Sequence, residues 1–167
     1  MTHATSAVSR DATPADFPAI LALNEESVHF LSPMTPDRLE RLHRESALHR
    51  VLTMDGVVAA FVLAFREGAD YDSVNYRWFA GRYERFLYID RVVVAAAFQG
   101  LGLGTVLYAD LFDFARASAA ARVTCEFDVD PPNEASRRFH ARYGFVEVGA
   151  QAVAGGKKTV SLQAVEL

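Results

Sequence analysis

Hydrophobic and polar positions repeat with regular periods along most of the chain, and these periods predict a series of short helices and strands. Apolar residues three and four positions apart, in two places after a Thr-Pro start signal, predict helices over 13–27, 35–46, 103–118 and 133–143. Runs rich in β-branched residues predict strands over 8–10, 51–54, 57–65, 89–94, 123–128, 145–148 and 159–165. No repeat, linker or low-complexity run interrupts the series, which predicts one mixed α/β domain over 1–167.

The segment 66–86 follows neither period. It is long for a connection, and it carries several aromatic residues, among them Tyr71, Tyr76 and Trp78. Connections of this length are usually functional or disordered, and the aromatic content argues against disorder. Two interpretations remain open: the rings close the edge of the core, or they line a substrate pocket.

The composition narrows the class of protein. Of the 167 residues, 51% are hydrophobic and 23% are charged, which is typical of a soluble globular domain. The formal net charge of −4 argues against a general nucleic-acid binder, and no apolar run approaches the roughly 20 residues that span a bilayer. The single cysteine, Cys125, cannot form an internal disulfide. We therefore expect a cytoplasmic protein with no nucleic-acid or membrane partner.

A glycine-rich turn joins the predicted strand 89–94 to the predicted helix 103–118. The connection reads Gln99-Gly100-Leu101-Gly102-Leu103-Gly104. The first amides of a helix have no partner within the helix, the helix dipole is positive there, and glycines let a ligand approach the backbone closely. This stretch therefore predicts a backbone cradle for an anionic group.

A second motif follows about thirty residues later. It reads Asn133-Glu134-Ala135-Ser136-Arg137-Arg138-Phe139-His140-Ala141-Arg142-Tyr143-Gly144-Phe145. The two motifs, in this order, resemble the signature of the GNAT superfamily of acyl-CoA-dependent N-acyltransferases. The chain departs from that signature in three places: Ala96 replaces a proline, Gln99 replaces the commoner arginine, and His140 replaces a tyrosine. The resemblance implies a mixed, mostly antiparallel and twisted sheet flanked by helices.

The resemblance also implies that acetyl-CoA is bound by the end of the strand, the glycine turn and the second motif. The oxyanion of the reaction would meet the amide of Val94 or of its immediate neighbour. The residues implied in binding acetyl-CoA are Val92, Val93, Val94, Gln99, Gly100, Leu101, Gly102, Leu103, Gly104, Thr105, Asn133, Ser136 and Phe139.

Acetylation of an amine requires a proton acceptor, because a lysine-like amine has a pKa of about 10.4 and is protonated at neutral pH. Strand alternation places Asp90 on one face together with Tyr88, Val92 and Val94. A carboxylate within a β-branched run is costly unless it is paired or functional. We expect Asp90 to receive the proton, through water, or to anchor the ammonium. The alternative is a structural ion pair, and Glu84 and Glu126 are weaker candidates for the base.

The second motif supplies candidates for the proton donor. His140 stands where the family has a tyrosine, so it could donate to the leaving thiolate, serve as the base, or hydrogen-bond the coenzyme sulfur. Tyr143 lies three residues further along the same predicted helix and could supply the phenol instead.

The remaining expectations concern the acceptor. The resemblance places the acceptor side of the site beside His29, Phe30, Tyr71, Tyr76, Trp78 and Tyr88, whose mixed character suits a small molecule or an amino acid. We expect direct transfer in a ternary complex, because Cys125 is predicted to be buried. The histidines show no metal-ligand spacing, so no metal is expected. Dimers are common in the family. The alternative function is a non-catalytic acyl-CoA-binding sensor. A dinucleotide-dependent oxidoreductase is disfavoured, since the Gly-x-Gly-x-x-Gly spacing is absent.

Overall fold

The computed structural model describes residues 7–29 and 31–167, and these residues form two compact units. The first unit comprises the chain up to Ala64 and the stretch 91–114, and the second comprises 65–90 and 115–167. The boundaries fall inside the third strand, the fourth strand and the fourth helix, so each of these elements contributes to both units. The single domain expected over 1–167 stays a prediction.

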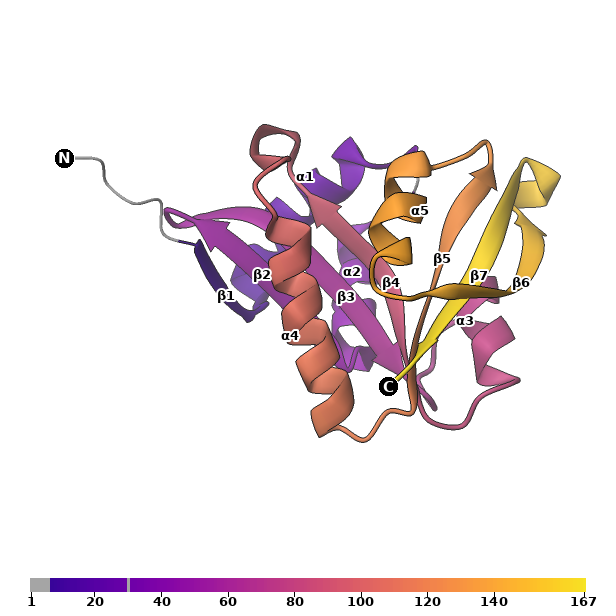
Figure 1. The fold of residues 1–167 in the computed structure, drawn as a ribbon. Coiled ribbons are helices and arrows are strands. Elements are labelled where there is room, and N and C mark those ends of the chain that lie inside the picture. The colour runs from indigo at the N-terminus through magenta and orange to yellow at the C-terminus, as the bar shows by residue number, and fades with distance from the viewer. Residues whose placement is uncertain (1–6, 30) are drawn as a thin grey trace. The chain divides into compact units, whose positions relative to one another are not determined.

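The first unit contains an antiparallel meander that continues into the second half of β4 (Figure 1). Strand β1 pairs antiparallel with β2, and β2 pairs antiparallel with β3. Its elements are β1 (Ala7–Asp11), α1 (Phe17–Glu26), α2 (Pro36–Glu45), β2 (Leu48–Met54), β3 (Val57–Arg66, as far as Ala64), β4 (Phe86–Val94, from Arg91) and α4 (Leu103–Ala117, as far as Phe114). All of the helices and strands predicted for this part of the chain are present, with ends that shift by a few residues.

Local chemistry accounts for these boundaries. The Thr35 hydroxyl accepts a hydrogen bond from the Arg38 amide at 3.2 Å, which caps α2 at the predicted start. The Asp55-Gly56 turn has φ angles of 50° and 82°, the left-handed pair that a two-residue hairpin requires. The predicted hairpin is therefore confirmed.

Helices cover both faces of the first unit's strands. On one face, the buried core joins α1 and α2 to the strands through Ile20, Leu39, Val51 and Phe61. On the other face, Arg50 forms an ion pair with Asp110 of α4 at 3.4 Å, and α4 lies on the near side of β2 and β3 in Figure 1. The alternation of neighbouring strand residues between core and α4 is the period-two pattern expected of a sheet covered on both faces.

We predict that the protein loses stability in mild acid, because His49 is buried in the first unit. This side chain is 6% exposed, and its Nδ1 lies 2.8 Å from Nδ1 of His43. Burial, with a smaller effect of the His43 charge opposed by Asp16, lowers the pKa of His49 from 6.5 to about 4. The unfolded chain therefore binds more protons between pH 6.5 and 4, so stability is complete above pH 6.5 and falls towards pH 4. We expect the free energy of unfolding to drop by about 3 kcal/mol over this window.

Urea unfolding at pH 7.5, 5.5 and 4.5 measures this drop. Substitution His49→Phe keeps an aromatic ring beside Phe17 and Phe61 and removes the titrating group. The pH slope should then become much shallower, whatever the absolute stability of the variant. An unchanged slope in His49→Phe would assign the acid sensitivity to other groups.

The second unit contains one parallel pair of strands and two antiparallel pairs. The first part of β4 pairs parallel with β5, β5 pairs antiparallel with β7, and β7 pairs antiparallel with β6 (Figure 1). Beside the shared β4, its elements are α3 (Val74–Ala80), β5 (Arg122–Asp130), α5 (Glu134–Ala141), β6 (Val146–Val153) and β7 (Lys158–Glu166). The predicted strands and the predicted helix over 133–143 are present, and β6 is longer than expected.

Different helices cover the two faces of the second unit's strands. Phe127 of β5 stacks on His140 of α5, with ring centroids 5.9 Å apart. The neighbouring β5 residue Glu126 faces the opposite side, where it accepts a hydrogen bond from the Tyr88 phenol. Tyr88 in turn contacts Phe79 of α3, with ring centroids 5.8 Å apart. Helices α5 and α3 therefore lie on opposite faces.

Helix α3 corrects the expectation that the segment 66–86 is irregular. Ser73 caps this helix, since its hydroxyl accepts from the Tyr76 amide at 3.2 Å. The helix has only seven residues, three of them aromatic, which explains why no helical period is visible in the sequence. Its rings pack into a cluster with the strands, and the members of this aromatic cluster are Phe65, Tyr71, Tyr76, Phe79, Phe86 and Tyr88.

The fold class is confirmed as a mixed α/β fold with mostly antiparallel strands flanked by helices. Across 7–29 and 31–167, no helix is both long enough and apolar enough to cross a membrane.

Candidate functional site

The glycine turn of the first unit has the backbone conformation of an anion cradle. Gly100 and Gly102 have φ angles of 82° and 77°, which L-residues rarely adopt. A Cβ atom at either position would meet no atom of non-neighbouring residues within 4 Å, so the backbone conformation, rather than lack of space, calls for glycine. Both glycines are exposed, and a ligand can therefore reach this backbone.

The start of α4 presents backbone amides beside these glycines. The amide of Val106 bonds to the carbonyl of Gly102 at 3.2 Å, which is the first bond of the helix. The amides of Leu103, Gly104 and Thr105 precede it, and they point out of the positive end of the helix. Together with the left-handed glycines, these amides suit the diphosphate of a coenzyme A derivative. Because the backbone supplies these donors, the fit does not depend on an arginine at position 99, where this chain has Gln99.

The end of β4 supplies a further backbone donor. The Ala95 amide bonds to the Ala59 carbonyl of β3 at 2.8 Å. Neighbouring residues of a strand direct their amides to opposite sides, so the Val94 amide points away from β3. On that side, Gln99 Nε2 donates to the Val94 carbonyl at 3.4 Å. Of the two amides left open by the sequence, Val94 is therefore the better oxyanion donor.

The valine side chains of β4 differ in their surroundings. Val93 is buried in the core with α1 and α2, whereas Val92 and Val94 are half-buried. Arg91 lies on the same face as Val93, and its Nη1 donates to Asn24 Oδ1 of α1 at 2.9 Å. The alternation predicted for this strand is therefore present within the first unit.

In the second unit, two phenol–carboxylate pairs lie where the ladder between β4 and β5 stops. This ladder runs over three residue pairs and ends at Tyr88 and Thr124, while both strands continue. Directly beyond it, the Tyr71 phenol donates to Asp90 Oδ1 at 2.5 Å, and the Tyr88 phenol donates to Glu126 Oε1 at 2.8 Å. Burial, and then the charges of Glu126 and Asp90, raise the pKa of Tyr88 well above its usual value. Tyr88 is therefore a neutral hydrogen-bond donor.

On the other face, α5 begins at the predicted cap and carries His140 in a defined tautomer. Asn133 Oδ1 accepts from the Ser136 amide at 3.2 Å. His140 Nδ1 lies 2.8 Å from the Ser136 carbonyl, which can only accept, so Nδ1 carries the hydrogen and Nε2 carries the lone pair. Burial lowers the pKa of His140, opposed by the bond to Ser136, and the ring is neutral at pH 7. His140 Nε2 is thus a hydrogen-bond acceptor.

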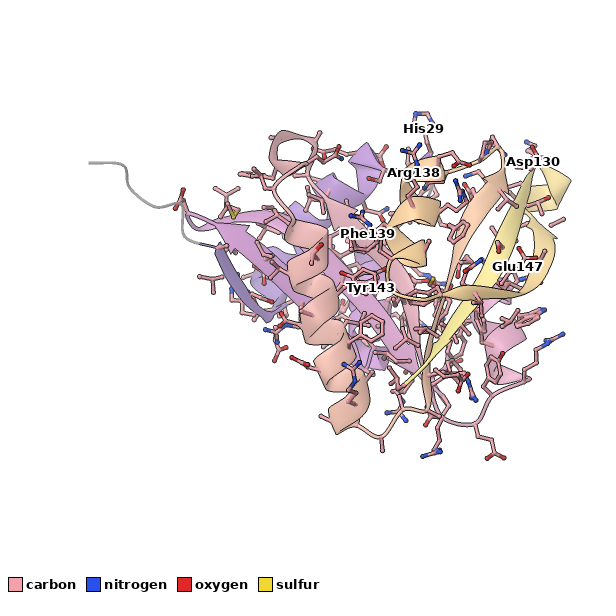
Figure 2. All side chains as sticks on the ribbon, viewed as in Figure 1. His29, Asp130, Arg138, Phe139, Tyr143 and Glu147 are labelled. Atoms are coloured by element: carbon pink, nitrogen blue, oxygen red, sulfur yellow. The ribbon has the colours of Figure 1, made fainter. Side chains whose placement is uncertain are left out.

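Two further rings of this region point to one side of α5. Phe139 and Tyr143 lie together in Figure 2, with ring centroids 5.2 Å apart. Both are half-buried, in contrast to His140, which is 4% exposed. Tyr143 is therefore the more accessible of the two candidate proton donors.

The candidate base Asp90 and the imidazole of His140 lie on opposite faces of the second unit. Asp90 and Glu126 share the face covered by α3, and His140 stacks on the face covered by α5.

The residues expected beside the acceptor have varied environments. His29 is exposed, and Phe30 lies outside the described residues. Trp78 packs against Gly149 so closely that a Cβ there would lie 2.4 Å from its ring, and the Arg82 guanidinium lies 3.7 Å from the centroid of its ring. The phenols of Tyr71 and Tyr88 donate to carboxylates, and that of Tyr76 donates to the Arg66 carbonyl at 2.7 Å. The predicted contacts of these residues with a substrate stay a prediction.

The lone cysteine is unsuited to covalent catalysis. Cys125 is 2% exposed on β5, and burial, with a smaller effect of the Glu126 charge, raises the pKa of its thiol well above the usual value. A nucleophilic cysteine requires the thiolate. This environment favours direct transfer over an acyl-enzyme.

Known proteins share this sequence pattern and this fold. The model of the acetyltransferase (GNAT) family matches residues 16–145. A phosphinothricin N-acetyltransferase from Streptomyces coelicolor is 44% identical over 66 residues, which are 40% of this chain and 37% of that protein. The match thus spans a little over a third of the length of that relative.

Solved structures resemble the fold over nearly the whole chain. Ard1 from Thermoplasma volcanium has a TM-score of 0.79 at 19% identity, covering 96% of this chain and 97% of that one. The structure of yncA, a putative acetyltransferase from Salmonella typhimurium with its cofactor acetyl-CoA, has a TM-score of 0.73 at 22% identity, covering 97% of this chain and 94% of that one. Since the family model spans most of the chain, from the start of the first helix to the end of the second motif, this chain belongs to the acetyltransferase (GNAT) family.

Proposed function

We propose that the protein is an N-acetyltransferase that moves an acetyl group from acetyl-CoA directly to a primary amine in a ternary complex. The observation that carries the proposal is the pair of left-handed glycines, Gly100 and Gly102, directly before the free amides of α4, in a chain of the GNAT family. When bound, acetyl-CoA supplies the activated thioester that an amine attacks.

In this proposal, residues of the first unit bind the coenzyme and polarise the thioester carbonyl. The amides from Leu103 to Thr105 bind the diphosphate, and the backbone of Val92 and Val94 binds the pantetheine arm. The Val94 amide is the preorganised donor that acyl transfer needs where negative charge develops on oxygen. The resemblance to the GNAT signature also assigns Asn133, Ser136 and Phe139 to coenzyme binding, and this assignment stays a prediction.

In this proposal, side chains of the second unit accept the proton of the amine and donate a proton to the leaving thiolate. Asp90 accepts the proton of the acceptor amine, with Glu126 as the nearby second carboxylate. Tyr143 donates to the leaving thiolate, because its ring is half-buried and accessible. His140 acts as a hydrogen-bond acceptor through Nε2, which is supported by its Nδ1 contact with Ser136. The sequence left three roles open for His140, and this contact favours the roles other than proton donor.

The proposed acceptor is the amine of a small molecule or an amino acid. The name of the phosphinothricin N-acetyltransferase supports an acceptor of this size, since that protein aligns with 40% of this chain. The proposal includes a cytoplasmic location, inferred from the single cysteine. It also includes a homodimer, because dimers are common in the family.

Thiol release from acetyl-CoA, measured against a panel of amines, tests the proposal. The panel contains amino acids, polyamines, aminoglycosides, arylalkylamines and peptides with free N-termini. Release with one class identifies the acceptor and supports transfer. If no amine is acetylated while acetyl-CoA still raises the melting temperature, the non-catalytic sensor becomes the better explanation. Silence without stabilisation would contradict both functions.

A further inference from the structure

We propose that Tyr71 is a positioning residue, which holds the Asp90 carboxylate in the orientation that accepts the proton of the amine. The inference rests on the proposed function, because it needs Asp90 to be the proton acceptor. It gives Tyr71 a role beside the substrate contact that the sequence suggested.

The contact between the two side chains is short and well defined. The Tyr71 phenol donates to Asp90 Oδ1 at 2.5 Å, within the range of hydrogen bonds to an ionised carboxylate. A carboxylate is planar, so a donor that holds Oδ1 also sets the direction of Oδ2. Tyr71 is 6% exposed, whereas Asp90 is half-buried. The carboxylate is therefore within reach of a ligand, and its support is protected from solvent.

The ring of Tyr71 is itself held in place. It stacks on Phe65 with ring centroids 4.4 Å apart, and it contacts Tyr76 at 5.6 Å. The Tyr76 hydroxyl accepts from the Ala69 amide at 3.0 Å and donates to the Arg66 carbonyl at 2.7 Å. These two bonds anchor the backbone just before Tyr71. The phenol is thus preorganised before any substrate arrives, as a catalytic carboxylate requires of its support.

Among the phenols of this region, Tyr71 is the one that donates a hydrogen bond to Asp90. Of the two nearby phenols in the aromatic cluster, Tyr88 donates to Glu126 at 2.8 Å and Tyr76 donates to the Arg66 carbonyl at 2.7 Å. Glu126 and Asp90 are both close enough to Tyr88 to act on it electrostatically. The Tyr71 hydrogen bond therefore selects one orientation of the Asp90 carboxylate beside these groups.

A double-mutant cycle tests the proposal in the full-length protein. The variants are Tyr71→Phe, Asp90→Asn and the double variant, assayed by thiol release with the amine identified by the panel. Tyr71→Phe should lower kcat about 10-fold, the rate equivalent of one hydrogen bond to a charged group, with KM for acetyl-CoA unchanged. In the Asp90→Asn background the same change should cost almost nothing, because the asparagine accepts no proton.

Tyr83→Phe is the matched control. It removes a phenol from the same segment, beside the Arg122 guanidinium rather than Asp90, and should leave kcat unchanged. A full 10-fold cost of Tyr71→Phe in the Asp90→Asn background would overturn the positioning role and leave a general effect on folding. Wild-type kcat in Tyr71→Phe would overturn it as well. In both of these cases the wild-type protein still acetylates the amine and the proposed function stands; failure of the wild type with every amine removes both.

Discussion

Replacing Asp90 with asparagine is expected to lower kcat/KM for the amine about 100-fold, the usual contribution of a general base. Asparagine has nearly the size of aspartate and can still accept the Tyr71 hydrogen bond, so the packing of the aromatic cluster should survive. The loss then reports the missing proton acceptor rather than a missing shape. KM for acetyl-CoA should remain unchanged, because the proposed coenzyme cradle involves other residues. Steady-state thiol release with each substrate varied in turn measures these quantities.

The choice of acceptor separates a base from a purely structural carboxylate. An amine of low pKa is already neutral at the assay pH, so it should suffer a smaller loss in Asp90→Asn than an aliphatic amine does. Asp113→Asn, an exposed change on α4, serves as the control and should behave like the wild type. Equal activity of Asp90→Asn and wild type with an aliphatic amine would show that Asp90 has a structural role.

Replacing Gly102 with alanine is expected to weaken acetyl-CoA binding about 10-fold or more. An L-residue in the left-handed region costs roughly 1–2 kcal/mol, and relaxation of this strain would turn the first amides of α4 away from the ligand. The φ of 77° and the open space around the missing Cβ mean that the effect is conformational rather than a clash. Isothermal titration with acetyl-CoA measures the dissociation constant, and urea unfolding measures the accompanying stability.

Gly155→Ala provides a matched control for the backbone strain. Gly155 lies between β6 and β7 with φ of 66°, and its missing Cβ also meets open space. Both variants should lose a similar amount of stability, and only Gly102→Ala should lose affinity for acetyl-CoA. Equal affinities in the two variants would mean that this glycine serves the fold and does not bind the coenzyme.

Much of the fold was predictable because its signals are local. The cap of α2 needs only the Thr35 hydroxyl and the backbone of the next turn, and the hairpin needs only Asp55-Gly56. Helix α3 was not predictable in this way. It is only seven residues long, too short to be stable by itself, and burial of the Tyr76 and Phe79 rings in the aromatic cluster stabilises it instead.

The candidate site likewise has features that depend on local sequence and features that depend on tertiary contacts. The sequence by itself determined the glycine turn and the cap at Asn133, since each depends on the conformation of a few consecutive residues. Only the tertiary structure decided that Tyr71 meets Asp90, nineteen residues further along the chain, and that Trp78 lies against Gly149. Spacing along a chain carries no information about such contacts, because they arise when the folded strands and helices bring distant side chains within hydrogen-bond or packing distance.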